Sequence, residues 1–87
     1  MKLLMVSPDD NVAVALSNLS PGQVAVIHGG DQKLIIDRGV PQGHKVAVLN
    51  MKKGEEIVKA GIVIGVLYQG VKKGAHIHVH NLRSKYL

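Results

Sequence analysis

Three histidines, His76, His78 and His80, alternate with apolar residues near the end of the chain. Because successive side chains of a β-strand point to opposite faces, the three imidazoles would share one face, with Ile77 and Val79 on the other. Neighbouring imidazoles would lie about 6.6 Å apart, so one metal ion could take two of them but not readily the outer pair. The pattern predicts a surface that binds substrate, transfers protons or holds a metal; ordinary solvated surface is the alternative.

A second candidate is the turn at Gly43, which sets His44 and Lys45 at the head of an apolar run. An imidazole beside an ammonium suits a carboxylated substrate, although a plain polar turn explains the spacing equally well. Asn81 and Arg83 follow the histidine strand, and a guanidinium binds carboxylates through two parallel hydrogen bonds. The substrate or interface candidates are therefore His44, Lys45, Asn81 and Arg83, and the metal candidates are His76, His78 and His80, with no catalytic residue identified among them.

The elements that must position these residues are short strands. Apolar runs recur between glycines and prolines, at residues 3–6, 24–27, 34–36, 45–49, 57–58, 62–64 and 75–80. Asp10 and Asn11 offer helix N-cap chemistry, and the apolar positions after them recur at helical spacing, which predicts a helix over residues 10–18. The expected fold is mainly β with one short helix, in a single domain spanning residues 1–87.

A turn that ends in glycine recurs ahead of several strands. Lys52-Lys53-Gly54 and Lys72-Lys73-Gly74 share it, and Ser20-Pro21-Gly22 is a looser copy. We interpret these segments as one turn-then-strand device in which glycine supplies a positive φ.

The composition limits the classes of function. The chain has 87 residues, a formal charge of +5 and no cysteine, so disulfides and thiolate ligands are excluded and any metal ligands are histidines or oxygen donors. Aromatic residues make up 2%, too few for a base-stacking platform, which argues against a nucleic-acid partner despite the positive charge. No apolar run approaches the roughly 20 residues of a membrane span, so no membrane association is expected and the cytoplasm is the default location.

Four segments together resemble one enzyme family: Asp10 to Leu16, Gly43-His44-Lys45, Lys59 to Gly65, and Gly74 to Asn81 with Arg83. Their order and spacing are similar to those in the N-terminal domain of altronate and galactarate dehydratases. In some members of the family, such as the related sulfolactate sulfo-lyase, this domain is a separate small subunit. The resemblance covers nearly the whole chain and implies a SAF domain with a β-clip fold, in which bent hairpins fold over one another.

The resemblance also implies a function, that of the small subunit of a sugar-acid hydro-lyase, inactive alone. Such a subunit would join a large catalytic subunit and bring a histidine-rich strand to the interface where the sugar-acid carboxylate binds. The reaction would be β-elimination of water, assisted in the assembled enzyme by a divalent metal, iron(II) or manganese. Gly43, His44, His78, His80 and Asn81 match the family pattern most directly.

Two other functions stay open beside this one. The chain could be a stand-alone SAF-type carbohydrate-binding module without catalysis, or the small subunit of a sulfolactate sulfo-lyase. A pure carbohydrate module gives no reason for the histidine strand, and a nucleic-acid binder is the least favoured alternative. An exposed apolar strand edge would in addition favour a homo-oligomer.

Overall fold

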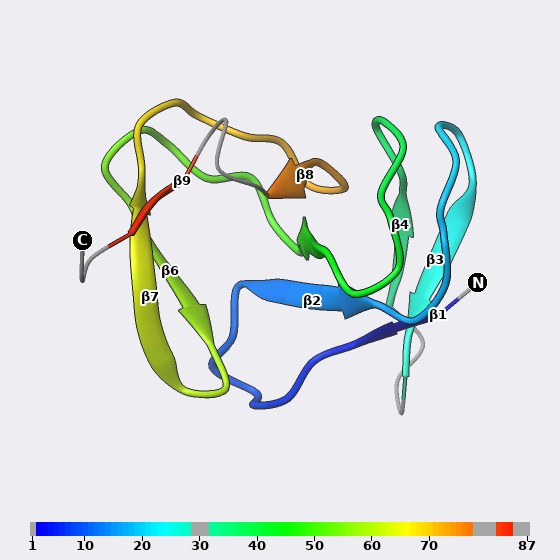
Figure 1. The fold of residues 1–87 in the computed structure, drawn as a ribbon, viewed down its shortest axis with the longest axis horizontal. Coiled ribbons are helices and arrows are strands. Elements are labelled where there is room, and N and C mark those ends of the chain that lie inside the picture. Colours follow the sequence, from blue (N-terminus) through cyan, green and yellow to red (C-terminus); the bar gives the residue numbers. More distant parts are fainter. Residues whose placement is uncertain (1, 29–31, 78–81, 85–87) are drawn as a thin grey trace.

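The computed structural model describes residues 2–28, 32–77 and 82–84, and in these segments every regular element is a β-strand (Figure 1). A six-stranded sheet has the order β4-β3-β1-β2-β5-β8 and a three-stranded sheet the order β6-β7-β9. The first comprises β1 (Lys2–Leu4), β2 (Val12–Ala15), β3 (Val24–Ile27), β4 (Lys33–Ile35), β5 (Lys45–Ala47) and β8 (His76–Ile77). The second comprises β6 (Glu56–Lys59), β7 (Ile62–Leu67) and β9 (Leu82–Ser84). The described segments contain no helix able to cross a membrane.

The mainly β fold class is confirmed, but the helix predicted over residues 10–18 is wrong. Strand β2 occupies its centre, paired antiparallel with β1 on one side and β5 on the other. Val12, Ala13 and Ala15 are buried, so both faces of this strand pack against other residues. Burial of both faces of an alternating Val-Ala segment favours the extended chain over a helix with one apolar stripe.

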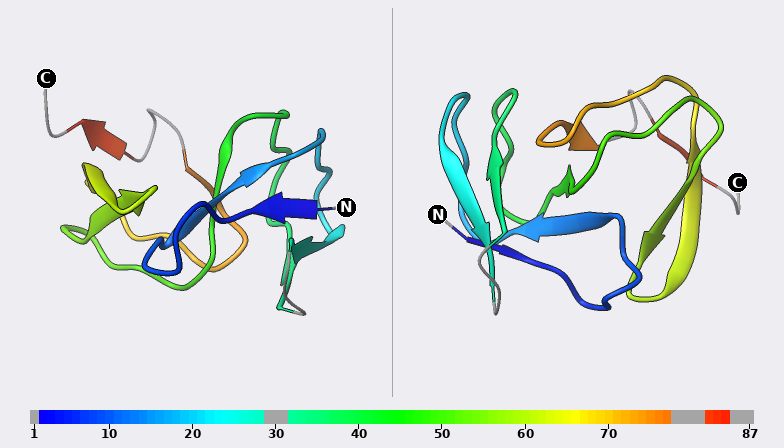
Figure 2. Two further views of the ribbon diagram at one scale, coloured as in Figure 1. Left: turned by 90° about the horizontal axis from the view of Figure 1, so that it is seen from below. Right: turned by 180° about the vertical axis from the view of Figure 1, so that it is seen from behind.

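Two apolar clusters lie on the two faces of the six-stranded sheet. The sheet bends, so that β3 and β4 run at a steep angle to β2 (Figures 1 and 2). The β3–β4 pair lies at one end of the molecule and the β6–β7 hairpin at the other. Inside the bend lies the first cluster, to which Leu3, Ala25, Leu34 and Val46 belong. On the other face of the sheet, β6 and β7 cover Val12, Ala47 and Ile77 with Ile57 and Leu67.

Four turns of one kind connect the strands, and they confirm the turn-then-strand device. In each, a backbone N–H donates to the C=O three residues earlier, from Gln23 to Ser20 (3.1 Å), His44 to Pro41 (3.0 Å), Glu55 to Lys52 (3.1 Å) and Ala75 to Lys72 (2.9 Å). The third residue of each turn is a glycine with positive φ, as a type II turn requires, namely Gly22, Gly43, Gly54 and Gly74. The turn at Pro41 is a further copy of the device.

Gly74 differs from the other three turn glycines in its surroundings. A Cβ atom at Gly74 would meet the backbone oxygen of Ile35 at 2.0 Å, whereas one at Gly22, Gly43 or Gly54 would meet nothing within 4 Å. The N–H of Asp37 donates to the C=O of Gly74 (3.1 Å). The chain leaving β4 therefore lies directly against the turn that precedes β8.

Asp10 fastens the β6–β7 hairpin to the larger sheet. Its carboxylate accepts hydrogen bonds from the N–H groups of Ala60 (2.8 Å) and Gly61 (2.9 Å), the two turn residues of that hairpin, and of Ser7 (3.0 Å). Ala60 and Gly61 have φ values of 55° and 75°, which orients both N–H groups toward the carboxylate. Asp10 thus caps a β-turn and not the helix that its position suggested.

The Asp10 carboxylate is buried, with 5% of the residue exposed. Burial acts to raise its pKa, but the backbone N–H donors, with Gly61 and Ala60 the strongest, outweigh this effect and hold the pKa below its ordinary value. Because the pKa is lower in the folded chain, the ionised carboxylate stabilises the fold above the ordinary pKa of about 3.9. This stabilisation is lost as the pH falls through the pKa of the folded state.

We expect Asp10→Asn to lower the free energy of unfolding at pH 7 by about 2–3 kcal/mol, because an amide cannot accept all three hydrogen bonds. The control is Asp9→Asn, which makes the same change of charge at an exposed neighbour and should change stability by less than about 0.5 kcal/mol. Urea unfolding at pH 7 and near pH 2 measures both effects. A difference between wild type and Asp10→Asn that does not shrink in acid would contradict the electrostatic explanation.

Candidate functional site

Two histidines from distant parts of the chain meet at one end of the six-stranded sheet. Nδ1 of His44 lies 2.9 Å from Nε2 of His76, and the ring centroids are 5.1 Å apart with the planes tilted by 33°. At this distance one nitrogen must carry the hydrogen while the other presents its lone pair. The two imidazoles therefore act as a hydrogen-bonded pair that can pass a proton between Nδ1 of His44 and Nε2 of His76.

Strand pairing explains why these two residues meet. His76 opens β8 and pairs with Val46 on β5, while His44 immediately precedes β5 in the turn at Gly43. His44 and Val46 are two residues apart, so both side chains point to the face where His76 lies. Both rings are partly buried, which leaves part of each exposed at the surface.

A hollow of about 200 Å³ adjoins this pair on the His76 side. Its lining consists of Asp37, Arg38, residues 69–72, Ala75 and His76. The two walls are the chain that leaves β4 and the turn before β8, which are held together at Gly74. The volume is below the roughly 300–1,000 Å³ of pockets for drug-sized ligands, so the hollow suits one polar end of a small molecule.

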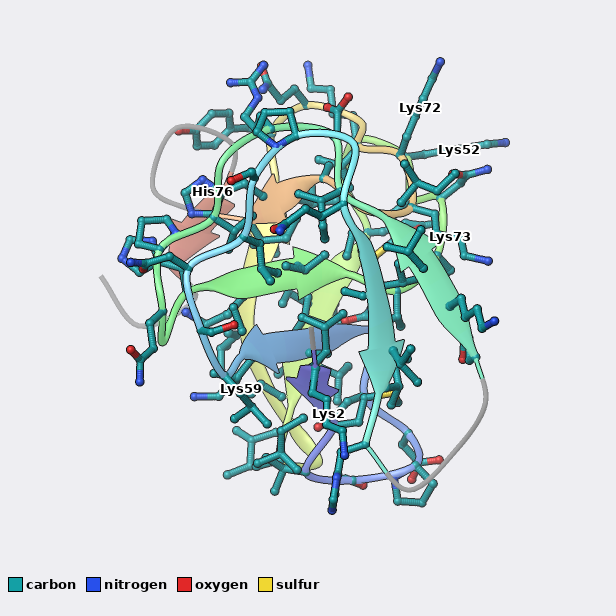
Figure 3. The ribbon with its side chains drawn as sticks, turned by 90° about the vertical axis from the view of Figure 1, so that its right-hand side faces the viewer. Lys2, Lys52, Lys59, Lys72, Lys73 and His76 are labelled. Atoms are coloured by element: carbon teal, nitrogen blue, oxygen red, sulfur yellow. The ribbon has the colours of Figure 1, made fainter. Side chains whose placement is uncertain are left out.

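The charges around the hollow favour an anion. Arg38 and Lys72 supply two cationic side chains against the single carboxylate of Asp37. In Figure 3 the Lys72 side chain extends outward from the molecule. Arg38 can bind a carboxylate through two parallel hydrogen bonds. His76, which lines the same hollow, can exchange a proton with a ligand bound there.

A second hollow, of about 460 Å³, is lined by Asn18, Leu19, Gly39, Val40 and Pro41. None of these side chains is charged or titratable near neutral pH, so this hollow offers no acid–base chemistry. The first hollow is therefore the better candidate for a site.

Lys45 lies apart from this hollow. It pairs with Val14 on β2 and Ile77 on β8, and strand alternation directs its side chain to the face opposite that of His44. Burial, and then the positive charge of Lys59, lowers the pKa of Lys45. The structure thus separates the predicted pair of an imidazole and an ammonium, although both side chains remain partly exposed.

The other predicted site residues lie at or beyond the end of the described strand β8. His78, His80 and Asn81 lie outside the described residues, and Arg83 is in β9, where its backbone pairs with Val66 on β7. Of the histidine strand, the structure therefore places His76. It also places a residue that the sequence pattern did not single out, Arg38. The only local signal for Arg38 is a charged residue between a strand and Gly39, which is common in ordinary turns.

The described residues do not by themselves form a metal site. Within residues 2–28 and 32–77, no group of three or more His, Asp or Glu side chains is arranged to hold a metal ion. The His44–His76 pair offers two nitrogen donors, fewer than the usual four, and the nearby cations Arg38 and Lys72 disfavour a bare metal ion. This donor set suits an anion better than a divalent cation.

Comparison with known proteins gives one consistent relationship. The family model described as the altronate/galactarate dehydratase SAF domain matches residues 1–85. The altronate dehydratase of Escherichia coli (strain K12) is 33% identical over 84 residues, which cover 97% of this chain and 17% of the relative. The altronate dehydratase of Bacillus subtilis (strain 168) is 32% identical over 81 residues, which cover 93% of this chain and 16% of the relative. The (2R)-sulfolactate sulfo-lyase subunit alpha of Paracoccus pantotrophus is 32% identical over 62 residues, covering 71% of this chain and 92% of the relative. The chain thus spans about one sixth of the two dehydratases but nearly all of this subunit alpha.

Proposed function

Since the chain belongs to the SAF-domain family of altronate and galactarate dehydratases, we propose that it is the small component of a sugar-acid hydro-lyase. It would act with a larger catalytic part and be inactive alone, because its relatives among the dehydratases are about six times its length. The observation that carries the proposal is the hollow that Arg38 and Lys72 line together with His76, the hydrogen-bonded partner of His44.

In this proposal Arg38 holds the carboxylate of the sugar acid, and Lys72 adds a second positive charge. When the α-proton leaves, negative charge develops beside and on the carboxylate. The cations that hold the carboxylate stabilise this charge, which lowers the barrier to β-elimination. The His44–His76 pair sits where it can exchange a proton with the bound acid, and Nε2 of His76 can pass a proton on to Nδ1 of His44.

The expected metal ion, iron(II) or manganese, belongs in this proposal to the assembled enzyme, with most of its ligands on the larger part. When bound, such an ion would polarise the leaving hydroxyl group. The described residues of this chain contribute carboxylate binding and proton transfer.

The experiment is a kinetic comparison of Arg38→Gln with wild type in the assembled enzyme. Loss of a charge-assisted hydrogen bond of about 1.5–3 kcal/mol should raise KM for the sugar acid by about 10-fold or more, since each 1.4 kcal/mol corresponds to a factor of ten. Lys52→Gln is the control, because it also removes one positive charge. Lys52 is exposed, occupies the place of Lys72 in the sister turn and does not line the hollow. If both variants changed KM equally, general charge and not the hollow would be responsible.

A second candidate function is that of a sulfo-lyase subunit, which the 92% coverage of the subunit alpha of Paracoccus pantotrophus favours. Elimination of sulfite and elimination of water both need a held carboxylate and a transferred α-proton, so the hollow serves either reaction. Assembled enzyme supplied with sulfolactate or with a hexonate separates the two, because only the first reaction releases sulfite.

A further inference from the structure

One face of the six-stranded sheet is covered at one end only. Val12 on β2 pairs with Ala47 on β5, and both are buried under β6 and β7. Val14, two residues along β2, lies on the same face, and Leu4 on β1 pairs with it. Leu4 is 37% exposed, so the cover ends between these positions.

Beyond this point the uncovered face continues across β1, β3 and β4. Lys2 pairs with Val26, and on β3 and β4 Val24 pairs with Ile35, which sets all of them on the face of Leu4. Val24 is 50% and Ile35 68% exposed, and Leu16, which extends β2 opposite Lys2, is 44% exposed. Figure 3 looks directly onto the β3–β4 part of this face, with Lys2 below it. We call Leu4, Leu16, Val24 and Ile35, with Lys2 and Lys33, the open face.

The charged residues that strands β1 to β4 place on the open face are all lysines. Lys2 and Lys33 are exposed there, and β1, β2, β3 and β4 contain no Asp or Glu. A second copy of this chain on the open face would set lysines against lysines, which disfavours a symmetric pair. A partner that presents an apolar patch with a carboxylate rim would satisfy both the aliphatic side chains and the lysines.

We propose that the open face is the surface on which the larger catalytic part of the lyase docks, through an apolar patch rimmed by Asp and Glu. The proposal rests on the proposed function for the identity of the partner. It is supported by the length of the relatives, since the matched segment is 17% of one altronate dehydratase and most of that protein lies outside it. Exposed contiguous aliphatic side chains on a sheet face are typical of such interfaces.

The test uses a photo-activatable cross-linking amino acid at position 35 or 24 of the natural full-length protein in its own cells, followed by mass spectrometry of the linked peptides. Position 49 is the matched control, because Leu49 is 45% exposed but lies outside the six strands of this sheet. We expect positions 35 and 24 to link to a dehydratase-type catalytic region, on a partner chain or on the same polypeptide, at a yield at least 10-fold above that of position 49.

Links from position 35 to a second copy of this chain, links to an unrelated protein, or equal yields from positions 35 and 49 would each overturn the docking proposal. Ile35→Glu gives a second readout, because a carboxylate facing an acidic rim should weaken the complex by at least 10-fold in affinity. The two proposals fail separately. Arg38→Gln should cross-link like wild type while its KM rises. Where the catalytic region is on a partner chain, Ile35→Glu should regain full activity when its concentration is raised.

Discussion

Replacing His76 with alanine is expected to lower the turnover number of the assembled lyase by about 10²–10⁴-fold, the usual contribution of a positioned acid–base group. The substitution removes one ring of the pair whose nitrogens lie 2.9 Å apart, so His44 loses this hydrogen bond. It also removes an imidazole from the lining of the anion-binding hollow. A residue that affects chemistry more than binding should lower kcat with a smaller change in KM.

His28→Ala is the matched control for this prediction, because His28 is an exposed histidine in the turn after β3 and does not line the hollow. Its kcat should stay within about two-fold of wild type. Thermal unfolding of each variant shows whether the fold is retained, and the pH profile of kcat should change in His76→Ala alone. If His76→Ala kept wild-type kcat and pH profile while folded, the pair would have no part in the reaction.

Gly74→Ala is expected to unfold the domain or to lower its free energy of unfolding by about 4 kcal/mol or more. Two effects add at this position. The φ of +92° is unfavourable for any residue with a Cβ, by about 1–2 kcal/mol, and the Cβ would meet the backbone oxygen of Ile35 at 2.0 Å. Relief of that contact would push β4 and the Asp37–Arg38 segment away from the turn, so the hollow would open together with the loss of stability.

Gly54→Ala is a closely matched control, because Gly54 has the same φ of +92° in the sister turn and nothing within 4 Å of the added Cβ. It should cost about 1–2 kcal/mol, the conformational part alone. Thermal unfolding measures the comparison, at about 4–8 °C per kcal/mol for a domain of this size. Equal losses in the two variants would show that the contact with Ile35 adds nothing.

Local pattern was sufficient for most strands and for the turns. The apolar run at residues 24–27 predicts the strand Val24–Ile27 with the bounds that it has, and the recurring turns predict glycines with positive φ, which the structure confirms. These features depend on neighbours in the chain, such as alternation of apolar residues and the freedom of glycine. The predicted helix over residues 10–18 is wrong because it also rested on local spacing, and spacing alone does not reveal that β2 is buried on both faces.

The site depended on contacts that local pattern does not contain. His44 and His76 are separated by 32 residues and meet through the pairing of β5 with β8. Arg38 reaches the hollow because Gly74 allows the chain after β4 to lie against the turn before β8. Histidine alternation did point to His76, but its partner His44 and the cations that line the same hollow could be recognised only once the strands were paired.

An NMR titration of the isotopically labelled chain shows whether the hollow beside the His44–His76 pair binds the carboxylate of a sugar acid. Altronate should cause saturable shifts of the His76 ring and the Arg38 guanidinium signals, and Arg38→Gln should weaken binding at least 10-fold. Altritol, the neutral polyol with the same carbon skeleton, should leave both signals in place. Equal shifts with altritol, or altronate binding unchanged in Arg38→Gln, would show that this hollow does not bind the carboxylate.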